Sequence, residues 1–323
     1  MKPKIILEII AANREHLRLN SKMALDALSS LHKDFSEMKD EACIISLALN
    51  DSIAYMIFDA DYDKATSNSR SILGRFPRSK HSYLISYHLS VIGRCLALSG
   101  KHEQAKEALL QSLDISEHQL KQTNETISLS ADILHDLAMS NDMAGGNSKK
   151  TILYLGKALT ILSGTNMEIR KGVCLMGLGN VKYSEGKKRA ALRYYMKAAK
   201  VFEDQQIQNN LAAAYSNLGL CYVALGEMEK AEKYHNQALM VRLRIGNSDD
   251  IANSYFNLSQ FYDINKDLDK TYINLIECRN YAAKSINKKI YKDTLLWLES
   301  IALSRNDMAN VNKFREERQA ANL

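Results

Sequence analysis

The sequence predicts an all-α protein, an α-α superhelix of about seven to eight helical hairpins. The first observation is a repeat: the pair Leu218 and Gly219 recurs one period upstream as Leu178 and Gly179. The second is that apolar residues recur every three or four positions, which is the spacing of one helix face. The third is that only 2 prolines occur in 323 residues, and proline is the strongest helix breaker. A fixed period of roughly 40 residues is typical of a stacked array of small units.

The clearest hairpin is predicted at residues 211–244. Its first half has one apolar stripe that ends at Gly226, and glycine readily takes the left-handed conformation that closes a helix. Its second half carries Ala231 and Ala238 on a second stripe. Gly219 and Ala231 have small side chains, so we expect them to let the two helices approach closely. The segment therefore reads as two antiparallel helices joined by a short turn.

The turn after this hairpin is predicted at residues 246–249, where Gly246 and Asn247 precede two acidic residues. Asp249 or Asp250 can cap the next helix, because a side-chain oxygen accepts hydrogen bonds from the free N–H groups of a helix N-terminus. A new hairpin is therefore expected to begin directly after this turn.

We predict that residues 1–323 form a single solenoid, whose segments keep the repeat pattern with different clarity. Terminal units of solenoids need a polar outer face, so the mostly polar last helix is expected to be a cap, or else a connection to another domain. The inner turn of the irregular segment contains Gly145 and Gly146 and is expected to be lengthened. The predicted segments are divergent N-terminal hairpins at 1–125 (with a weak helical pair at 5–31), an irregular repeat at 126–163, clear repeats at 168–286, and a capping repeat and helix at 290–323.

The pattern resembles the tetratricopeptide repeat (TPR) family. The resemblance rests on the Leu-Gly pair and on an alanine pair, Ala191 with Ala198 and Ala231 with Ala238, standing in register. The period here is roughly 40 residues, whereas the standard repeat has about 34. This longer form is similar to the repeats of bacterial signalling regulators, kinesin light chains and spindle-orientation adaptors. The proline that the family usually has between repeats is missing.

The resemblance implies a non-catalytic scaffold that binds a protein or peptide in a concave groove, lined by the first helix of each hairpin. Asparagine has both donors and an acceptor, so it can bind the backbone of an extended peptide without reading its sequence. In the alternative interpretation, Asn217 and Asn257 only satisfy neighbouring helix contacts. The predicted groove residues are Asn180, Tyr183, Ser216, Asn217, Asn253, Phe256, Asn257, Gln260 and Asp263.

Some TPR proteins hold the terminal carboxylate of a peptide with asparagines and cations from consecutive repeats. Asn180 and Asn217 match the two asparagines of that motif, but the positions that match its cations are Asn253 and Asn257. Because no positive charge is left to neutralise a carboxylate, the C-terminus of a chaperone is not the expected ligand.

A second hypothesis is a bacterial signalling regulator or sensory module. The sequence is similar to peptide-responsive TPR regulators, and to TPR regions that act on a nucleotide cyclase or a histidine kinase. This hypothesis rests on analogy between families, since a fold does not by itself imply a function.

No catalytic residue, cofactor or metal site is predicted. The 8 histidines have no ligand spacing, and glycine-rich phosphate loops and nucleophile elbows are lacking. Residues 1–60 carry 7 Lys and Arg against 9 Asp and Glu, which argues against nucleic-acid binding. Membrane insertion is not expected either, because no apolar run approaches the roughly 20 residues that span a bilayer.

The 5 cysteines are odd in number, lie far apart and sit inside helical patterns. We therefore expect buried free thiols and a cytoplasmic location, since disulfides belong to oxidising compartments. The sequence makes no prediction of the oligomeric state.

The net charge of +6 is concentrated in the C-terminal half, where residues 170–323 carry 24 Lys and Arg against 17 Asp and Glu. Such an excess can steer an acidic partner toward the protein. We favour the simpler interpretation of a solvated outer face, because the two signs are interspersed.

Overall fold

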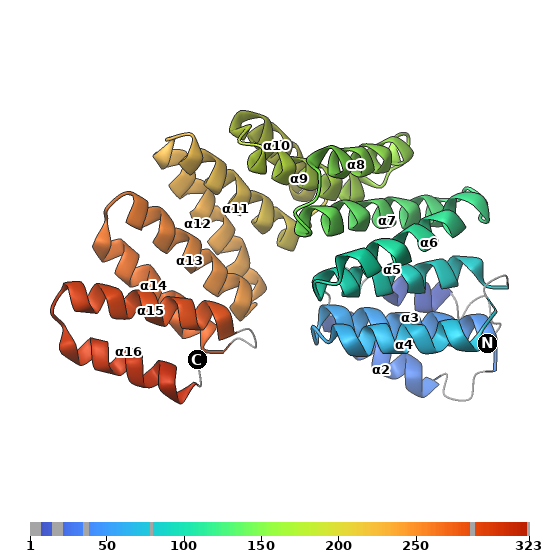
Figure 1. Ribbon diagram of the computed structural model, residues 1–323, viewed down its shortest axis with the longest axis horizontal. Coiled ribbons are helices and arrows are strands. Elements are labelled where there is room, and N and C mark those ends of the chain that lie inside the picture. The colour runs from blue at the N-terminus through green and yellow to red at the C-terminus, as the bar shows by residue number, and fades with distance from the viewer. Residues whose placement is uncertain (1–7, 15–21, 35–38, 78–79, 285–287, 322–323) are drawn as a thin grey trace. The chain divides into compact units, whose positions relative to one another are not determined.

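The computed structural model describes residues 8–14, 22–34, 39–77, 80–284 and 288–321. These residues form helices joined by turns and contain no strand, which confirms the predicted all-α array of helical hairpins (Figure 1). The chain divides into two compact units, Met1–Gly177 and Leu178–Leu323. Continuity of the array across residues 177–178 stays a prediction.

The first unit contains a helical segment at residues 8–14 and a series of antiparallel helices. Within the predicted N-terminal hairpins at 1–125, α5 and α6 form one hairpin at 82–118. The predicted pair at 5–31 lies partly outside the described residues. The helices are α2 (Lys22–Asp34), α3 (Glu41–Ile57), α4 (Tyr62–Arg75), α5 (Ser82–Leu98), α6 (His102–His118), α7 (Asn124–Met143) and α8 (Ser148–Leu162), and the boundary between the units falls within α9 (Glu168–Ser184).

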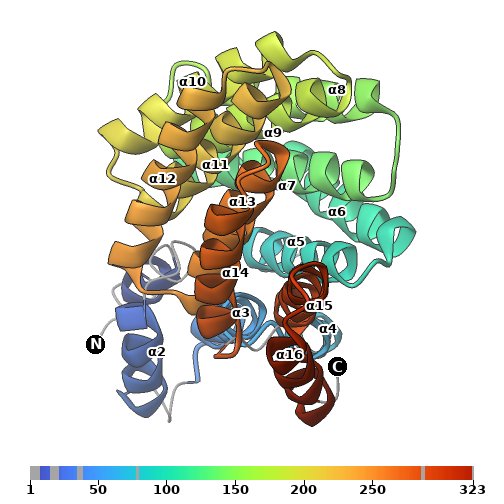
Figure 2. The same ribbon diagram turned by 90° about the vertical axis from the view of Figure 1, so that its left-hand side faces the viewer.

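The second unit continues the series with helices of more regular length. Figure 2 shows its hairpins from the side. The hairpin predicted at 211–244 is formed by α11 and α12. The helices are α10 (Lys188–Asp204), α11 (Gln208–Ala224), α12 (Met228–Ile245), α13 (Ser248–Ile264), α14 (Leu268–Ala282), α15 (Lys288–Ser304) and α16 (Met308–Ala320).

A left-handed backbone position closes the first helix of most hairpins and repeats with the sequence period. Gly186 and Gly226 take φ values of 76° and 75° there, which glycine adopts at no steric cost. The same position is occupied by non-glycine residues in other hairpins, at somewhat smaller φ. These are Ala60 (φ 50°), Lys266 (φ 60°) and Asn306 (φ 55°).

The irregular repeat has a simple geometric origin. The starts of α6 and α8, at His102 and Ser148, lie further apart in the sequence than the starts of α10 and α12, at Lys188 and Met228. The extra residues lie in a longer α7, which has 20 residues where α9 and α11 have 17, and in longer turns before and after it. The inner turn between α7 and α8 spans four residues instead of three, so the predicted lengthening at Gly145 and Gly146 is confirmed.

The odd-numbered helices form the inner row of each unit. α3 contacts α5 and α5 contacts α7 in the first unit, and α11 contacts α13 and α13 contacts α15 in the second. Among the described residues, no even-numbered helix contacts the next even-numbered helix in this way. Because neighbouring helices approach most closely on the concave side of a curved stack, the odd-numbered helices line that side of each unit.

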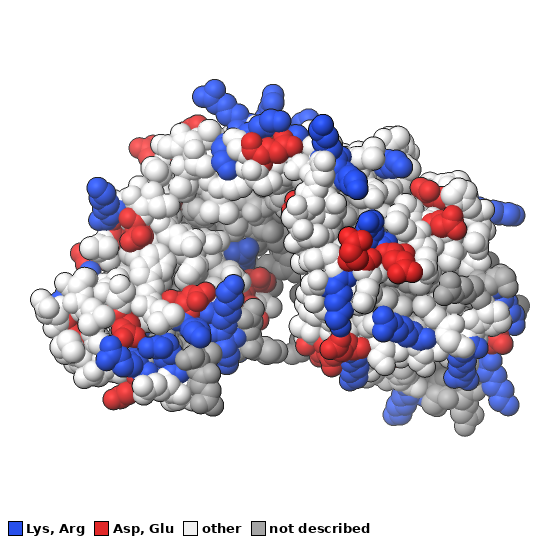
Figure 3. Space-filling model, viewed as in Figure 1, with Lys and Arg blue, Asp and Glu red and all other residues white. Residues whose placement is uncertain are grey.

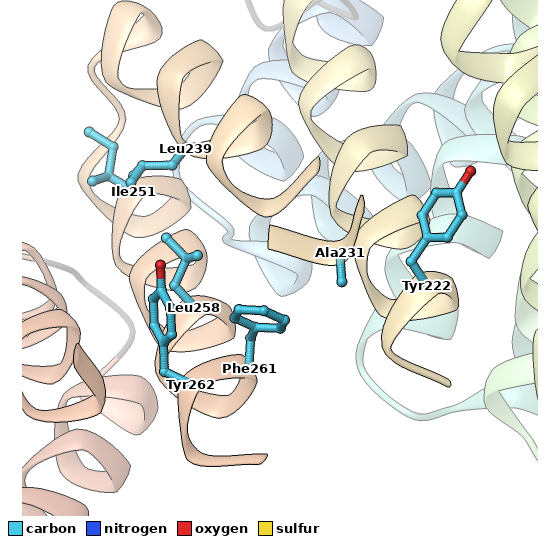
Figure 4. Packing of buried hydrophobic residues seen from close by; sticks show 7 residues of the cluster. All are labelled: Tyr222, Ala231, Leu239, Ile251, Leu258, Phe261 and Tyr262. Atoms are coloured by element: carbon cyan, nitrogen blue, oxygen red, sulfur yellow. The ribbon is translucent and has the colours of Figure 1, made fainter. Parts of the chain in front are cut away.

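One core cluster of the second unit is built from the facing stripes of three helices, α11, α12 and α13. Tyr222 stacks on Tyr234 with ring centroids 5.4 Å apart, and the Tyr262 hydroxyl donates to Glu232 Oε1 at 2.6 Å. Tyr222 and Tyr262, at the ends of α11 and α13, therefore bury their rings, and the Tyr262 hydroxyl also has a hydrogen-bond partner. Figure 4 shows seven members of this cluster: Tyr222, Ala231, Leu239, Ile251, Leu258, Phe261 and Tyr262.

The predicted cap of α13 is wrong by two or three residues. Asn247 is the capping residue, and its side-chain oxygen accepts a hydrogen bond from the backbone N–H of Asp250 at 3.1 Å. Asp249 and Asp250 instead occupy the first turn of α13. Their charges remain favourable there, because the N-terminus of a helix carries partial positive charge.

All five cysteines are buried and free, as the sequence predicts. Burial raises the pKa of the Cys174 thiol to about 12 and that of Cys95 to about 11. Since the thiolate is the reactive form, these side chains act as small apolar core residues. The described helices include none that is both long and apolar enough to cross a membrane.

Candidate functional site

All nine predicted groove residues lie on odd-numbered helices of the second unit, namely α9, α11 and α13. Three of them, Asn257, Gln260 and Asp263, line one pocket with a volume of about 450 Å³. The remaining walls of this pocket are not among the residues predicted from the sequence. They are Leu220, Val223, His235, Phe261, Ile264 and Trp297.

Two further predicted residues contact each other. The Asn217 side-chain amide donates to Asn180 Oδ1 at 3.4 Å, and the Tyr195 hydroxyl donates to the same oxygen at 2.8 Å. Asn180 and Asn217 thus link α9, α10 and α11. This link satisfies part of their hydrogen-bonding capacity within the protein, as the alternative interpretation of inner-face asparagines expects.

Phe256 contributes to the site through the aromatic ring of Trp297. The two rings meet edge to face with centroids 5.7 Å apart, joining α13 to α15. This geometry is the favourable one for an aromatic pair. It holds the indole of Trp297 in place at the pocket wall.

The other three predicted residues lie outside the pocket. The Asn253 amide donates to the backbone oxygen of Asp249 at 2.9 Å. The Lys188 ammonium lies 3.4 Å from the ring centroid of Tyr183. Ser216 is buried, and its hydroxyl has no hydrogen-bond partner among the described residues. Their role in binding stays a prediction.

Glycines on the inner helices let side chains of the outer helices reach the inner face. A Cβ on Gly219 would lie 2.7 to 2.8 Å from the ring of His235, and one on Gly179 would lie 2.4 Å from the ring of Tyr195. Tyr195 and His235 occupy equivalent positions of α10 and α12, one repeat period apart. Tyr195 passes Gly179 to bond Asn180, and His235 passes Gly219 to line the pocket.

His235 is an uncharged group at neutral pH. Its exposed fraction is 2%, and its Nε2 finds no hydrogen-bond partner in the described part of the chain. Burial, together with the nearby charge of Arg242, lowers its pKa to about 4. A buried polar atom without a partner is uncommon in native proteins, and here it belongs to a pocket wall.

Among α10 to α13, the positive charges lie on the outer helices and not on the inner ones. α11 and α13 contain no Lys or Arg, and α13 contains three aspartates. The outer helices α10 and α12 carry five and four Lys and Arg, respectively, and Figure 3 shows blue side chains gathered over α10. The basic excess of this half therefore lies mainly on an outer face, in agreement with the simpler interpretation of the sequence.

In the first unit, two ion pairs join neighbouring helices of the inner row. Arg94 on α5 makes a bidentate contact with Asp136 on α7, with Nη2 2.8 Å from Oδ2. Arg170 on α9 lies 3.3 Å from Asp132, one turn before Asp136 on the same helix. Both cations thus face carboxylates of α7.

The comparisons with known proteins agree with this architecture. Two tetratricopeptide repeat models match, one at residues 210–270 and one at residues 89–119. A search of curated protein sequences finds no match.

Several solved structures share the fold at low sequence identity. A Rap protein in complex with Competence and Sporulation Factor is similar with a TM-score of 0.68 and 15% identity over 99% of this chain and 93% of that chain. Aspartyl phosphate phosphatase F from Bacillus subtilis is similar with a TM-score of 0.61 and 15% identity over 99% of this chain and 85% of that chain. BtubC from P. vanneervenii is similar with a TM-score of 0.57 and 20% identity over 70% of this chain and 89% of that chain. At these identities the similarity establishes the fold of helical hairpins alone.

Proposed function

Because this chain is a tetratricopeptide repeat protein, we propose that it is a non-catalytic scaffold whose second unit binds an extended peptide or protein segment on its inner row of helices. The observation that carries the proposal is the pocket at Asn257, Gln260 and Asp263, which opens on that row. Its walls combine apolar and aromatic side chains with a few polar groups, the composition of most binding sites. Asn217 lies on the adjacent inner helix and extends the polar surface.

Two further points support the proposal. α11 and α13 lack Lys and Arg, which disfavours nucleic acid on this face, because phosphate contacts require cations. The five buried free cysteines support a reducing, cytoplasmic location.

The test is a pair of asparagine substitutions. The purified chain is used as bait, the captured partner is identified by mass spectrometry, and its Kd is measured by calorimetry. We expect Asn217→Ala with Asn257→Ala to weaken binding about tenfold, since each lost hydrogen bond contributes on the order of 0.7 kcal/mol. The melting temperature should fall by about 4 °C or less, because both side chains are half-buried and the Asn217 amide donates a long, 3.4 Å hydrogen bond to Asn180.

Asn274→Ala on the outer helix α14 is the matched control, since its amide donates only to the Lys270 carbonyl in the described contacts. Its Kd should equal that of the wild type. Unchanged affinity in the double variant would refute binding at the inner row, whereas a large fall in melting temperature would show that the asparagines act through folding.

A second candidate is a signalling regulator that responds to a peptide. It is favoured by the similarity of nearly the whole chain to the Rap protein that was solved with Competence and Sporulation Factor. A regulator must change conformation when its ligand binds, because a ligand acts only through its different affinity for two states. Small-angle scattering with and without the partner separates the candidates: compaction supports a regulator, and an unchanged profile supports a passive scaffold.

A further inference from the structure

The pocket of the second unit carries one exposed carboxylate and no cation. Asp263 lines the pocket at the end of α13. No ion pair joins it to a Lys, Arg or His of the described residues. Of the three inner helices that line the pocket, α11 and α13 have no Lys or Arg, and the three lysines of α15 (Lys288, Lys289 and Lys292) are not among its lining residues. A negative charge thus faces the pocket without an internal partner.

The remaining walls fit a long side chain with an apolar stem. Val223 and Ile264 provide aliphatic surface, and Trp297 provides an indole that its edge-to-face contact with Phe256 holds in place. Lys and Arg bury their methylene stems along such surfaces and keep the charged head near water. A planar guanidinium can also stack on an indole and bond a carboxylate, which a compact ammonium does less well.

Nothing in the pocket repels a cation at neutral pH. His235 is the only basic side chain among the lining residues, and burial keeps it neutral by lowering its pKa to about 4. Arg242, the charged neighbour of His235, is turned toward α13, where it donates to the Ser254 hydroxyl at 2.7 Å. Arg242 is therefore engaged with α13, and no Lys or Arg is among the lining residues of the pocket.

We propose that this pocket receives an arginine side chain of the bound segment, with the stem against Trp297 and the guanidinium at Asp263. The proposal rests on the function proposed above and adds its specificity: the second unit selects a positively charged segment and rejects an acidic one. Charge complementarity mainly determines specificity, because a like charge at the same place is strongly disfavoured.

The test uses acetylated and amidated pentapeptides of sequence Ala-Ala-Xaa-Ala-Ala, where Xaa is arginine, citrulline or glutamate. Citrulline has the shape of arginine without its charge, so the comparison isolates the cation. Trp297 is the single tryptophan of the chain, and its emission therefore reports occupancy of this pocket alone. Anisotropy of fluorescein-labelled copies reports binding anywhere on the protein.

We expect the arginine peptide to bind about tenfold more tightly than the citrulline peptide, from one partly exposed ion pair and one cation–π contact. The glutamate peptide should bind more weakly than either. Asp263→Asn should reduce the ratio of arginine to citrulline affinity to about threefold, because the indole contact remains. Glu229→Gln on α12 removes the same charge from an exposed outer position and should leave the ratio unchanged.

The outcomes separate this proposal from the proposed function. Peptides that bind and change the emission of Trp297 without preference for arginine would overturn the arginine pocket and leave the inner row as the binding surface. Equal ratios in the wild type and the Asp263→Asn variant would overturn it as well. If no peptide changes the anisotropy, both proposals fail together.

Discussion

Replacing Asp136 by alanine lowers the free energy of unfolding of the first unit by about 3 kcal/mol. The carboxylate is 7% exposed and accepts a bidentate contact from Arg94. The substitution takes the Asp136 carboxylate away from the Arg94 guanidinium, and breaking a buried pair costs about 3 to 5 kcal/mol. The expected loss is at the lower end of this range because the Arg94 side chain is 31% exposed, so water can solvate part of the guanidinium in the variant.

Urea denaturation followed by circular dichroism measures this loss. Asp114→Ala is the matched control, because Asp114 pairs with His118 on an exposed surface of α6, where an ion pair contributes about 0 to 1 kcal/mol. A loss below about 1 kcal/mol in the Asp136 variant would mean that the pair does not hold the inner row together.

Stability of both units decreases as the pH falls from about 6.5 to about 4. Burial lowers the pKa of His88 in the first unit and of His235 in the second to about 4, against about 6.5 in an unfolded chain. Between these values the unfolded state binds a proton that the folded state does not, so acid favours unfolding. The stabilisation is complete above pH 6.5 and is lost progressively toward pH 4.

The two histidines differ in their partners. His88 Nε2 donates to the Ile45 carbonyl at 3.1 Å, and its Nδ1 lies 3.0 Å from the Ser69 hydroxyl, whereas Nε2 of His235 has no partner among the described residues. Each shift corresponds to at most about 3 kcal/mol.

Melting temperatures measured from pH 4 to pH 8 test this prediction. Carboxylates also titrate in this range, so the comparison is between the wild type and the variants His88→Gln and His235→Gln. Each variant should have a flatter pH dependence than the wild type between pH 4 and 6.5. Identical pH dependence in all three proteins would show that neither histidine is held neutral by its surroundings.

The hairpins could be predicted because their helices obey local rules. The constant repeat period and the apolar stripes predict the hairpin at 211–244 to within three residues of the ends of α11 and α12. In both units the left-handed turn is made at some hairpins by residues that carry no glycine signal, Ala60 in the first unit and Lys266 and Asn306 in the second. The spacing between the starts of α6 and α8 also exceeds the regular period and breaks the register, so that the repeat at 126–163 looks irregular.

Part of the pocket could have been found from the same register. Leu220 stands one period before Gln260, and Trp297 stands one period after Asn257, so the predicted positions point to their equivalents in adjacent hairpins. His235 is different, because it belongs to an outer helix. The sequence feature that marks its position is Gly219, whose missing side chain leaves space for the His235 ring. From the sequence, this glycine predicted only that the two helices pack closely.

The ion pairs of the first unit could not be derived from sequence. Arg94 and Asp136 are 42 residues apart, outside the regular period, and Asp132 lies one turn away on the same helix. Several pairings of the two arginines with the two aspartates are compatible with the sequence. Only the packing of α5, α7 and α9 determines which charges meet.

Site-specific photocross-linking shows whether the inner row of the second unit is the surface that binds the partner. Benzoylphenylalanine is placed at Gln260 on α13, which is exposed and lines the pocket, or at Glu229 on α12, which is exposed on the outer row. With the captured partner present, irradiation should join the partner to the variant with the probe at position 260 and leave the variant with the probe at position 229 unlinked. Cross-linking at position 229 alone would place the partner on the outer helices and contradict the account.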